Sequence, residues 1–175
     1  MKKLIKTILR EEINSKENEI SNNFIEKLKD LLIDGKYLYH YTLNNHLVSI
    51  QEEGLIPRKN PNSWYSNGVE GVFLTTHDSL YKANLPNSVY NKMKNWKKWD
   101  IDIKKPIVRL WIDITKLNPD KLIWDDDYAE DKFNDNKAET HEEKVIESLY
   151  IWGSIAYLDI IPPSHIVKYD YAYYP

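Results

Sequence analysis

The chain has 175 residues, 42% of them hydrophobic, and this length and composition predict one domain with one sizeable core. The formal net charge is −3, from 24 basic and 27 acidic residues, whereas a dedicated nucleic-acid binder usually carries a basic excess. The absence of cysteine excludes disulfides, thiolate catalysis and cysteine-ligated zinc.

The sequence contains no apolar run close to the length of about 20 residues that spans a membrane. Residues 1–10 combine too short an apolar stretch with too mixed a charge for a signal peptide. We therefore expect a cytoplasmic protein without a membrane partner.

The first predicted element is a helical segment over residues 1–34. Its second half carries one apolar stripe, at spacings of four, four and three, formed by Ile20, Phe24, Leu28 and Leu31. Gly35 follows as the left-handed residue that ends a helix. We expect these helices to pack on a core formed by residues 35–175, giving one globular unit.

Two strands and a short helix are predicted next. Residues 36–41 alternate aromatic and aliphatic side chains, as a strand does. A helical face that ends at Gly54 is formed by Leu43, Leu47 and Ile50. Residues 57–70 are rich in Pro, Asn, Ser and Gly and predict a loop, and residues 71–75 predict a short buried strand.

The remaining pattern favours strands over helices. Residues 107–114 are the clearest later strand, and residues 118–143 read as a polar, acidic region with Asp125 in a solvated loop. Three further strands are predicted over residues 145–151, 155–160 and 166–171. The predicted fold class is α+β.

Three short blocks carry the chemical information. Residues 38–42 read Leu-Tyr-His-Tyr-Thr and place His40 at the end of a strand, where a ligand can be contacted. Residues 54–57 read Gly-Leu-Ile-Pro and close the short helix. Residues 71–75 read Gly-Val-Phe-Leu-Thr and open the second buried strand.

These blocks, in this order, resemble the ADP-ribosyltransferase superfamily, in particular the His-Tyr-Glu group and the toxin-type mono-ADP-ribosyltransferases. The resemblance covers roughly residues 36–166 and is strongest over residues 38–76. It implies an ADP-ribosyltransferase-like split β-sandwich of two small sheets with an N-terminal helical segment. It also implies that NAD⁺ binds as the substrate in the cleft between the sheets and that no metal is needed.

The resemblance assigns cofactor-binding roles on the first strand. His40 is expected to hydrogen-bond the adenosine ribose of NAD⁺, and backbone groups of Tyr41 to pair with the nicotinamide amide. Thr42 completes the candidate NAD⁺-binding residues of this block. Many relatives carry glycine where this chain has Tyr41, and a buried histidine bonded to a carbonyl is the structural alternative for His40.

The second strand supplies the next candidates. Phe73 is expected to pack against nicotinamide, at a position where the group usually has tyrosine, and ordinary core packing is its alternative. Thr75 follows where relatives often place a hydroxyl residue near the nicotinamide ribose. Tyr65, in the intervening loop, is a second candidate wall of the nicotinamide site.

Transfer of ADP-ribose breaks the bond between nicotinamide and ribose through a transition state that resembles an oxocarbenium ion. A carboxylate near the developing positive charge stabilises it. The resemblance assigns this role to Glu147, read as the residue that heads a late strand. Nearby rivals are Glu139, Glu142 and Glu143, and an alternative alignment puts Ala156 at this position and makes the protein inactive.

The implied function is a mono-ADP-ribosyltransferase that moves ADP-ribose from NAD⁺ to a protein or nucleic-acid acceptor, as a toxin, defence factor or phage-encoded modifier. An inactive relative that binds a nucleotide, a protein or a nucleic acid is the alternative. An RNA 2′-phosphotransferase ranks lower, because Arg58 is the only candidate for its phosphate-binding residues.

Overall fold

The computed structural model describes residues 22–32, 34–59, 70–76, 107–125 and 138–172 and shows a mixed α+β protein. Its helices are one over residues 22–29, α2 (Leu47–Glu53) and α5 (His141–Trp152). Its strands are β1 (Tyr37–Leu43), β2 (Arg58–Lys59), β3 (Glu70–Thr75), β4 (Ile107–Asp113), β5 (Leu122–Trp124), β6 (Ser154–Tyr157) and β7 (Ile166–Ala172). No helix in these ranges is both long enough and apolar enough to cross a membrane.

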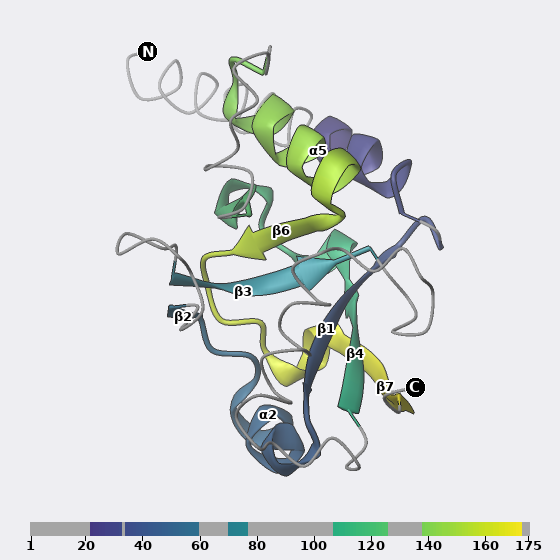
Figure 1. Ribbon diagram of the computed structural model, residues 1–175, viewed down its shortest axis with the longest axis vertical. Helices are drawn as coiled ribbons and strands as arrows, with labels where there is room; N and C mark the ends of the chain where they lie inside the picture. The colour runs from purple at the N-terminus through teal and green to yellow at the C-terminus, as the bar shows by residue number, and fades with distance from the viewer. Residues whose placement is uncertain (1–21, 33, 60–69, 77–106, 126–137, 173–175) are drawn as a thin grey trace, which may run out of the picture.

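The strands form a 7-stranded antiparallel sheet in the order β5-β6-β3-β1-β4-β7, with β2 paired to β3. The sheet is nearly divided in two, because β1 and β3 are paired only at Tyr39 and Thr75. By contrast, β1 pairs with β4 along its whole length, from Tyr37 opposite Asp113 to Leu43 opposite Ile107. Figure 1 shows the consequence, with β3 and β6 running across the direction of β1 and β4.

The hydrophobic core joins the helices to both parts of the sheet. The helix over residues 22–29 buries Phe24 and Leu28, as its predicted stripe requires, and α5 contributes Val145 and Leu149 to the same cluster. Gly35 has a φ of 63°, but the helix ends at residue 29 and not at residue 34 as predicted, so Gly35 lies beyond the helix end and does not terminate it. Ile20 and the rest of the predicted helical segment before residue 22 lie outside the described residues.

One face of the strands β1, β4 and β7 carries a cluster of aromatic and charged side chains. Arg109 on β4 lies 5.5 Å from the ring centroid of Tyr39 and 4.9 Å from that of Trp111. Its guanidinium donates two hydrogen bonds to Asp170 on β7, at 2.8 and 2.5 Å. These hydrogen bonds raise the pKa of Arg109 and lower the pKa of Asp170. Side chains of β1, β4 and β7 are thereby tied together on one face.

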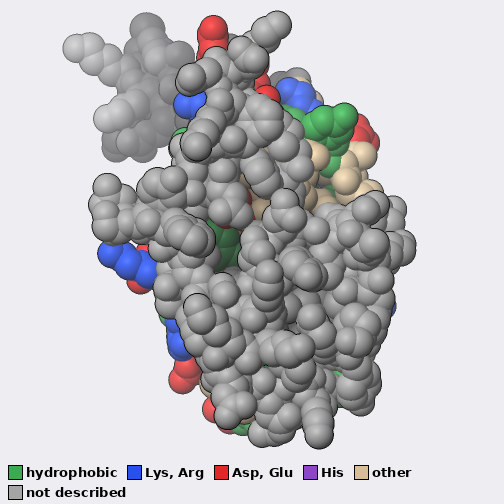
Figure 2. All heavy atoms as spheres, in the orientation of Figure 1, with side chains coloured by type: hydrophobic (Ala, Val, Ile, Leu, Met, Phe, Trp, Pro, Cys, Tyr) green, Lys and Arg blue, Asp and Glu red, His purple; other side chains and the backbone are tan. Residues whose placement is uncertain are grey.

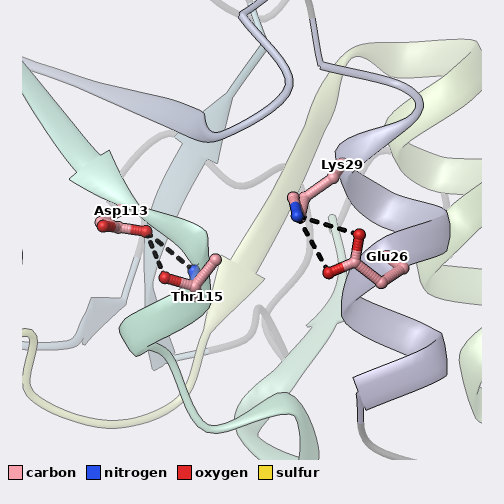
Figure 3. Close-up of polar contacts among 4 residues, drawn as sticks. All are labelled: Glu26, Lys29, Asp113 and Thr115. Carbon is pink, nitrogen blue, oxygen red and sulfur yellow. Dashed lines mark hydrogen bonds and ion pairs between the residues drawn. The ribbon is translucent and has the colours of Figure 1, made fainter.

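Polar caps define where several elements end. Asp113 ends β4 and caps the following turn, because its Oδ1 accepts hydrogen bonds from the backbone N–H of Thr115 at 3.1 Å and from its hydroxyl at 2.6 Å (Figure 3). Lys36 pairs with the other oxygen of Asp113 at 3.1 Å. On the exposed side of the helix over residues 22–29, Lys29 lies 2.9 Å from Glu26, one turn away (Figure 3).

The structure corrects the predicted strand over residues 145–151, which belongs to α5. Thr140 and Glu143 form a reciprocal capping box at the start of this helix. Gly153, with a φ of 66°, ends it in the left-handed conformation. These caps satisfy the backbone groups at both helix ends, so they favour a helix over the strand that an apolar run alone suggests.

Two smaller corrections concern the polar region over residues 118–143. It contains the short strand β5, which pairs with β6 and was not predicted. Asp125, expected in a solvated loop, is buried instead. The predicted strands over residues 36–41, 71–75, 107–114 and 166–171 are confirmed by β1, β3, β4 and β7.

Candidate functional site

His40 connects the two parts of the sheet. It lies on β1 opposite Leu110 of β4, is half-buried, and its Nδ1 lies 2.9 Å from the carbonyl oxygen of Phe73 on β3. Because a carbonyl oxygen only accepts hydrogen bonds, Nδ1 carries the proton in this contact. The contact therefore fixes the orientation of the ring at the point where β1 and β3 diverge.

A pocket of about 280 Å³ opens beside this contact. Its volume lies close to the lower end of the range for small-molecule sites, roughly 300–1,000 Å³. The walls come from β1, α2, β2, β3 and the segment after α2: residues 40–42, 46, 49–50, 53–56, 58–59 and 71–73. The predicted residues His40, Tyr41, Thr42 and Phe73 thus lie together around one cavity.

One helical wall of the pocket is polar. Leu47 and Ile50 bury their side chains in the core, and this orients α2. His46, Ser49 and Glu53, which follow one another by three and four residues, line the pocket. The Thr42 hydroxyl lies 3.3 Å from His46 Nδ1, which links β1 to this wall.

Gly54 brings the chain sharply past the pocket. Its φ is 84°, and a Cβ at this position would lie 2.3 Å from the carbonyl oxygen of Ile161. Immediately after it, Leu55 donates a backbone hydrogen bond to Ile161 at 2.9 Å and accepts one from it at 3.0 Å. Only glycine fits this conformation and this close approach, so the second sequence block is a backbone requirement of the pocket wall.

The open side of the pocket is charged. Arg58 and Lys59 of β2 are exposed and pair with Gly71 and Glu70 of β3 through the backbone. Within the described residues, the side chains of Arg58, Lys59 and Glu53 have no hydrogen-bond or ion-pair partner. Figure 2 shows Lys and Arg side chains, with Asp and Glu side chains beside them, along the edge on which β2 lies in Figure 1.

The other predicted site residues are placed differently. Thr75 is buried opposite Tyr39 and Ser154 and does not line the pocket. Tyr65 lies outside the described residues. Phe73 is half-buried, so its position fits a ligand contact as well as core packing.

Glu147 does not head a strand. It is a half-buried residue of α5 and is not among the pocket-lining residues. Figure 1 shows α5 and α2 at opposite ends of the long axis of the molecule. Of its rivals, Glu143 accepts backbone hydrogen bonds from Thr140 and Glu139, both at 3.0 Å, and these lower its pKa. Glu143 is therefore committed to the cap of α5.

The late strand β6 begins instead with Ser154, next to Thr75 of β3. The Ser154 hydroxyl donates a 2.5 Å hydrogen bond to Asp125, and Ser148 of α5 donates one of 2.8 Å to the Ser154 carbonyl. Ser148 also accepts a hydrogen bond from the backbone N–H of Asp125 at 3.0 Å. All three residues are buried. Their hydrogen bonds join the end of β5 to α5 and β6, and these bonds are made without a ligand.

Sequence reasoning missed the pocket roles of Glu53, Arg58, Lys59 and His46, apart from naming Arg58 as a phosphate candidate. The only signal in the sequence was the polar face of the helix that ends at Gly54. No cluster of three or more possible metal ligands occurs in the parts of the chain that the structure describes. Comparisons with protein-family models, with curated proteins and with solved structures gave no match.

Proposed function

We propose that the pocket binds NAD⁺ and that the protein is a mono-ADP-ribosyltransferase with a macromolecular acceptor. The observation that carries the proposal is that His40 and Phe73, from different parts of the sheet, line one cavity. These are the residues that the resemblance assigns to the adenosine ribose and to nicotinamide.

The division of the sheet supports the same proposal. A split β-sandwich with its ligand between two small sheets requires two groups of strands that diverge. Here the groups β2-β3-β5-β6 and β1-β4-β7 share a single residue pair, Tyr39 and Thr75, and the pocket lies where they diverge. We therefore propose that this α+β fold is an ADP-ribosyltransferase-like split β-sandwich.

The chemistry of the walls suits a dinucleotide. Phe73 offers a flat apolar face, and Arg58 and Lys59 offer positive charge for a diphosphate. His46 and Ser49 add hydrogen-bonding groups on the helical wall. The pocket thus combines the three kinds of group that a bound nicotinamide dinucleotide needs.

An inactive binding module is the second candidate, and one observation favours it. The strand that should begin with a catalytic glutamate begins with Ser154, and Glu147 lies in α5 away from the pocket lining. A protein of this kind would bind NAD⁺ or a related nucleotide without breaking it.

The test measures the melting temperature with and without NAD⁺, together with nicotinamide release. We expect NAD⁺ to raise the melting temperature of the wild type and His40→Ala to abolish most of that rise. His141→Ala is the matched control, because His141 also makes a contact to a backbone carbonyl, at 2.7 Å from Leu122. Release of nicotinamide supports the enzyme, and binding without release supports the inactive module. A wild type that does not respond to NAD⁺ overturns the enzyme, and it overturns the inactive module as a binder of NAD⁺.

A further inference from the structure

The proposed reaction requires a carboxylate beside the donor ribose, and the pocket supplies one that no sequence motif indicated. Glu53 is the only acidic residue among the described residues that line the cavity. We propose that Glu53 is the catalytic carboxylate that stabilises the oxocarbenium-like transition state of NAD⁺ cleavage. This inference rests on the proposed function.

The position of Glu53 is set by the helix and by the turn after it. It is the last residue of α2, three residues after the buried Ile50 and directly before Gly54. The backbone after Gly54 is held by the two hydrogen bonds between Leu55 and Ile161. The backbone that carries Glu53 is therefore held on both sides, at the edge of the cavity that His40 also lines.

The placement of Glu53 is unfavourable for stability alone. Carboxylates are disfavoured in the last turn of a helix, where the backbone carbonyls carry partial negative charge. Within the described residues the Glu53 side chain has no hydrogen-bond or ion-pair partner that compensates. A solvated negative charge at the mouth of a pocket is free to interact with a cation that develops on a bound ligand.

The cations of β2 complement this role. Arg58 and Lys59 line the same cavity as Glu53 without forming an ion pair with it. When the diphosphate of a dinucleotide binds against Arg58 and Lys59, it neutralises their charges. The Glu53 carboxylate then interacts with the ribose. The ligand class is therefore a pyridine dinucleotide, which carries both the anion and the incipient cation.

The other carboxylates are committed elsewhere or lie outside the cavity. Asp125 accepts the hydroxyl of Ser154 in a buried network. Glu143 caps α5, and Glu147 lies on α5 outside the pocket lining. Among the described residues, Glu53 is thus the carboxylate that shares a cavity with His40.

The step is balanced without a further reactant. The bond between ribose C1′ and the nicotinamide nitrogen breaks, and its electron pair stays with nicotinamide, which leaves as the neutral molecule. The acceptor oxygen or nitrogen, or water when no acceptor is present, attacks C1′ and loses its proton to solvent. Glu53 takes no part in the proton transfer, and its carboxylate contributes electrostatic attraction to the cationic ribose.

The experiment compares Glu53→Gln with Glu52→Gln in the full chain. Glu52 is the matched control, because it is an exposed neighbour in the same helix and does not line the pocket. The readouts are kcat and KM for nicotinamide release from NAD⁺, and the rise in melting temperature on NAD⁺ binding. We expect Glu53→Gln to lower kcat by about 100-fold to 1,000-fold, the range measured when one electrostatic contact to the charge of a transition state is removed. KM and the melting-temperature rise should change little, and Glu52→Gln should behave as the wild type.

Each other outcome overturns the assignment. If the wild type releases nicotinamide and Glu53→Gln does so equally, the role of Glu53 fails while the proposed function stands. Loss of release in Glu147→Gln together with retention in Glu53→Gln moves the role to α5. Weaker NAD⁺ binding by Glu53→Gln with an unchanged kcat makes Glu53 a binding residue only. A wild type that neither binds nor cleaves NAD⁺ removes the proposed function and the role of Glu53 with it, as does binding without cleavage.

Discussion

Replacing Gly54 by alanine tests the most tightly constrained point of the pocket wall. The residue has a φ of 84°, and an added Cβ would lie 2.3 Å from the carbonyl oxygen of Ile161 and 3.0 Å from Cα of Pro162. Both neighbouring atoms belong to the backbone, so a side-chain rotation cannot relieve the clash. The substitution must therefore separate the segment after α2 from the segment around Ile161.

The magnitude follows from two contributions. At a φ of 84° and a ψ of −169°, a conformation that is essentially restricted to glycine, a non-glycine residue costs about 1–3 kcal/mol. Separating the segments also breaks the two backbone hydrogen bonds between Leu55 and Ile161, at about 1 kcal/mol each. We expect Gly54→Ala to lower the free energy of unfolding by about 3–5 kcal/mol, the sum of these contributions.

Gly35→Ala is the matched control for this substitution. Gly35 also has a positive φ, 63°, but a Cβ there meets nothing within 4 Å. Its cost should be the conformational one alone, about 1–2 kcal/mol. The assay is urea denaturation of both variants and of the wild type, with thermal melts expected to shift by about 2–4 °C for each kcal/mol. Equal losses in the two variants would refute the reasoning, because they would show that the close approach to Ile161 costs nothing.

Asp113 and His165 predict how a substitution or a change of pH alters the free energy of unfolding. Burial opposes ionisation of Asp113, but hydrogen bonds from Thr115 and Lys36 outweigh it and hold its pKa below the usual value. Asp113→Asn should therefore lower the free energy of unfolding by about 1–3 kcal/mol at pH 7, measured by urea denaturation; an unchanged midpoint contradicts the role of this cap. In the wild type the contribution of Asp113 is present above the usual aspartate pKa, near about 4, and is lost as pH falls through the lower folded value. Desolvation and nearby Lys116 hold the pKa of His165 below its usual value, and its Nδ1 is buried without a hydrogen-bond partner in the described structure. Its neutral form is favoured in the folded state, so stability should be highest above about pH 6.5 and fall as pH drops through the folded pKa. Unfolding measured from pH 8 to 5 should show this loss in the wild type and less of it in His165→Gln, and parallel curves would rule it out.

The sequence by itself determined the elements whose pattern has one interpretation. The apolar stripe with Phe24 and Leu28 and the alternation in β1 and β4 are local signals, because each residue's environment follows from its own helix or strand period. Gly54 was also readable as the end of a helix, and its positive φ confirms that reading. His40 lines the pocket as expected from the first block, but it lies in the middle of β1 and not at the end of the strand as predicted.

Only the tertiary structure decided the ambiguous segments. In the sequence, the apolar run over residues 145–151 is compatible with a strand or with a helix. In the structure it is helical, and the capping box of Thr140 and Glu143 begins the helix that Gly153 ends. Asp125 was predicted to be solvated because its neighbours in the sequence are acidic. In the structure it is buried, and its carboxylate accepts a hydrogen bond from Ser154, which is distant in the sequence.

The pocket composition was decided in the same way. Glu53 and Arg58 meet His40 and Phe73 because the single Tyr39–Thr75 pair lets β1 and β3 diverge, while α2 buries Leu47 and Ile50 in the core. Spacing along the chain specifies which residues share a helix face or a strand face. Which faces meet depends on strand order and on the burial of distant apolar surfaces, and these are properties of the whole fold.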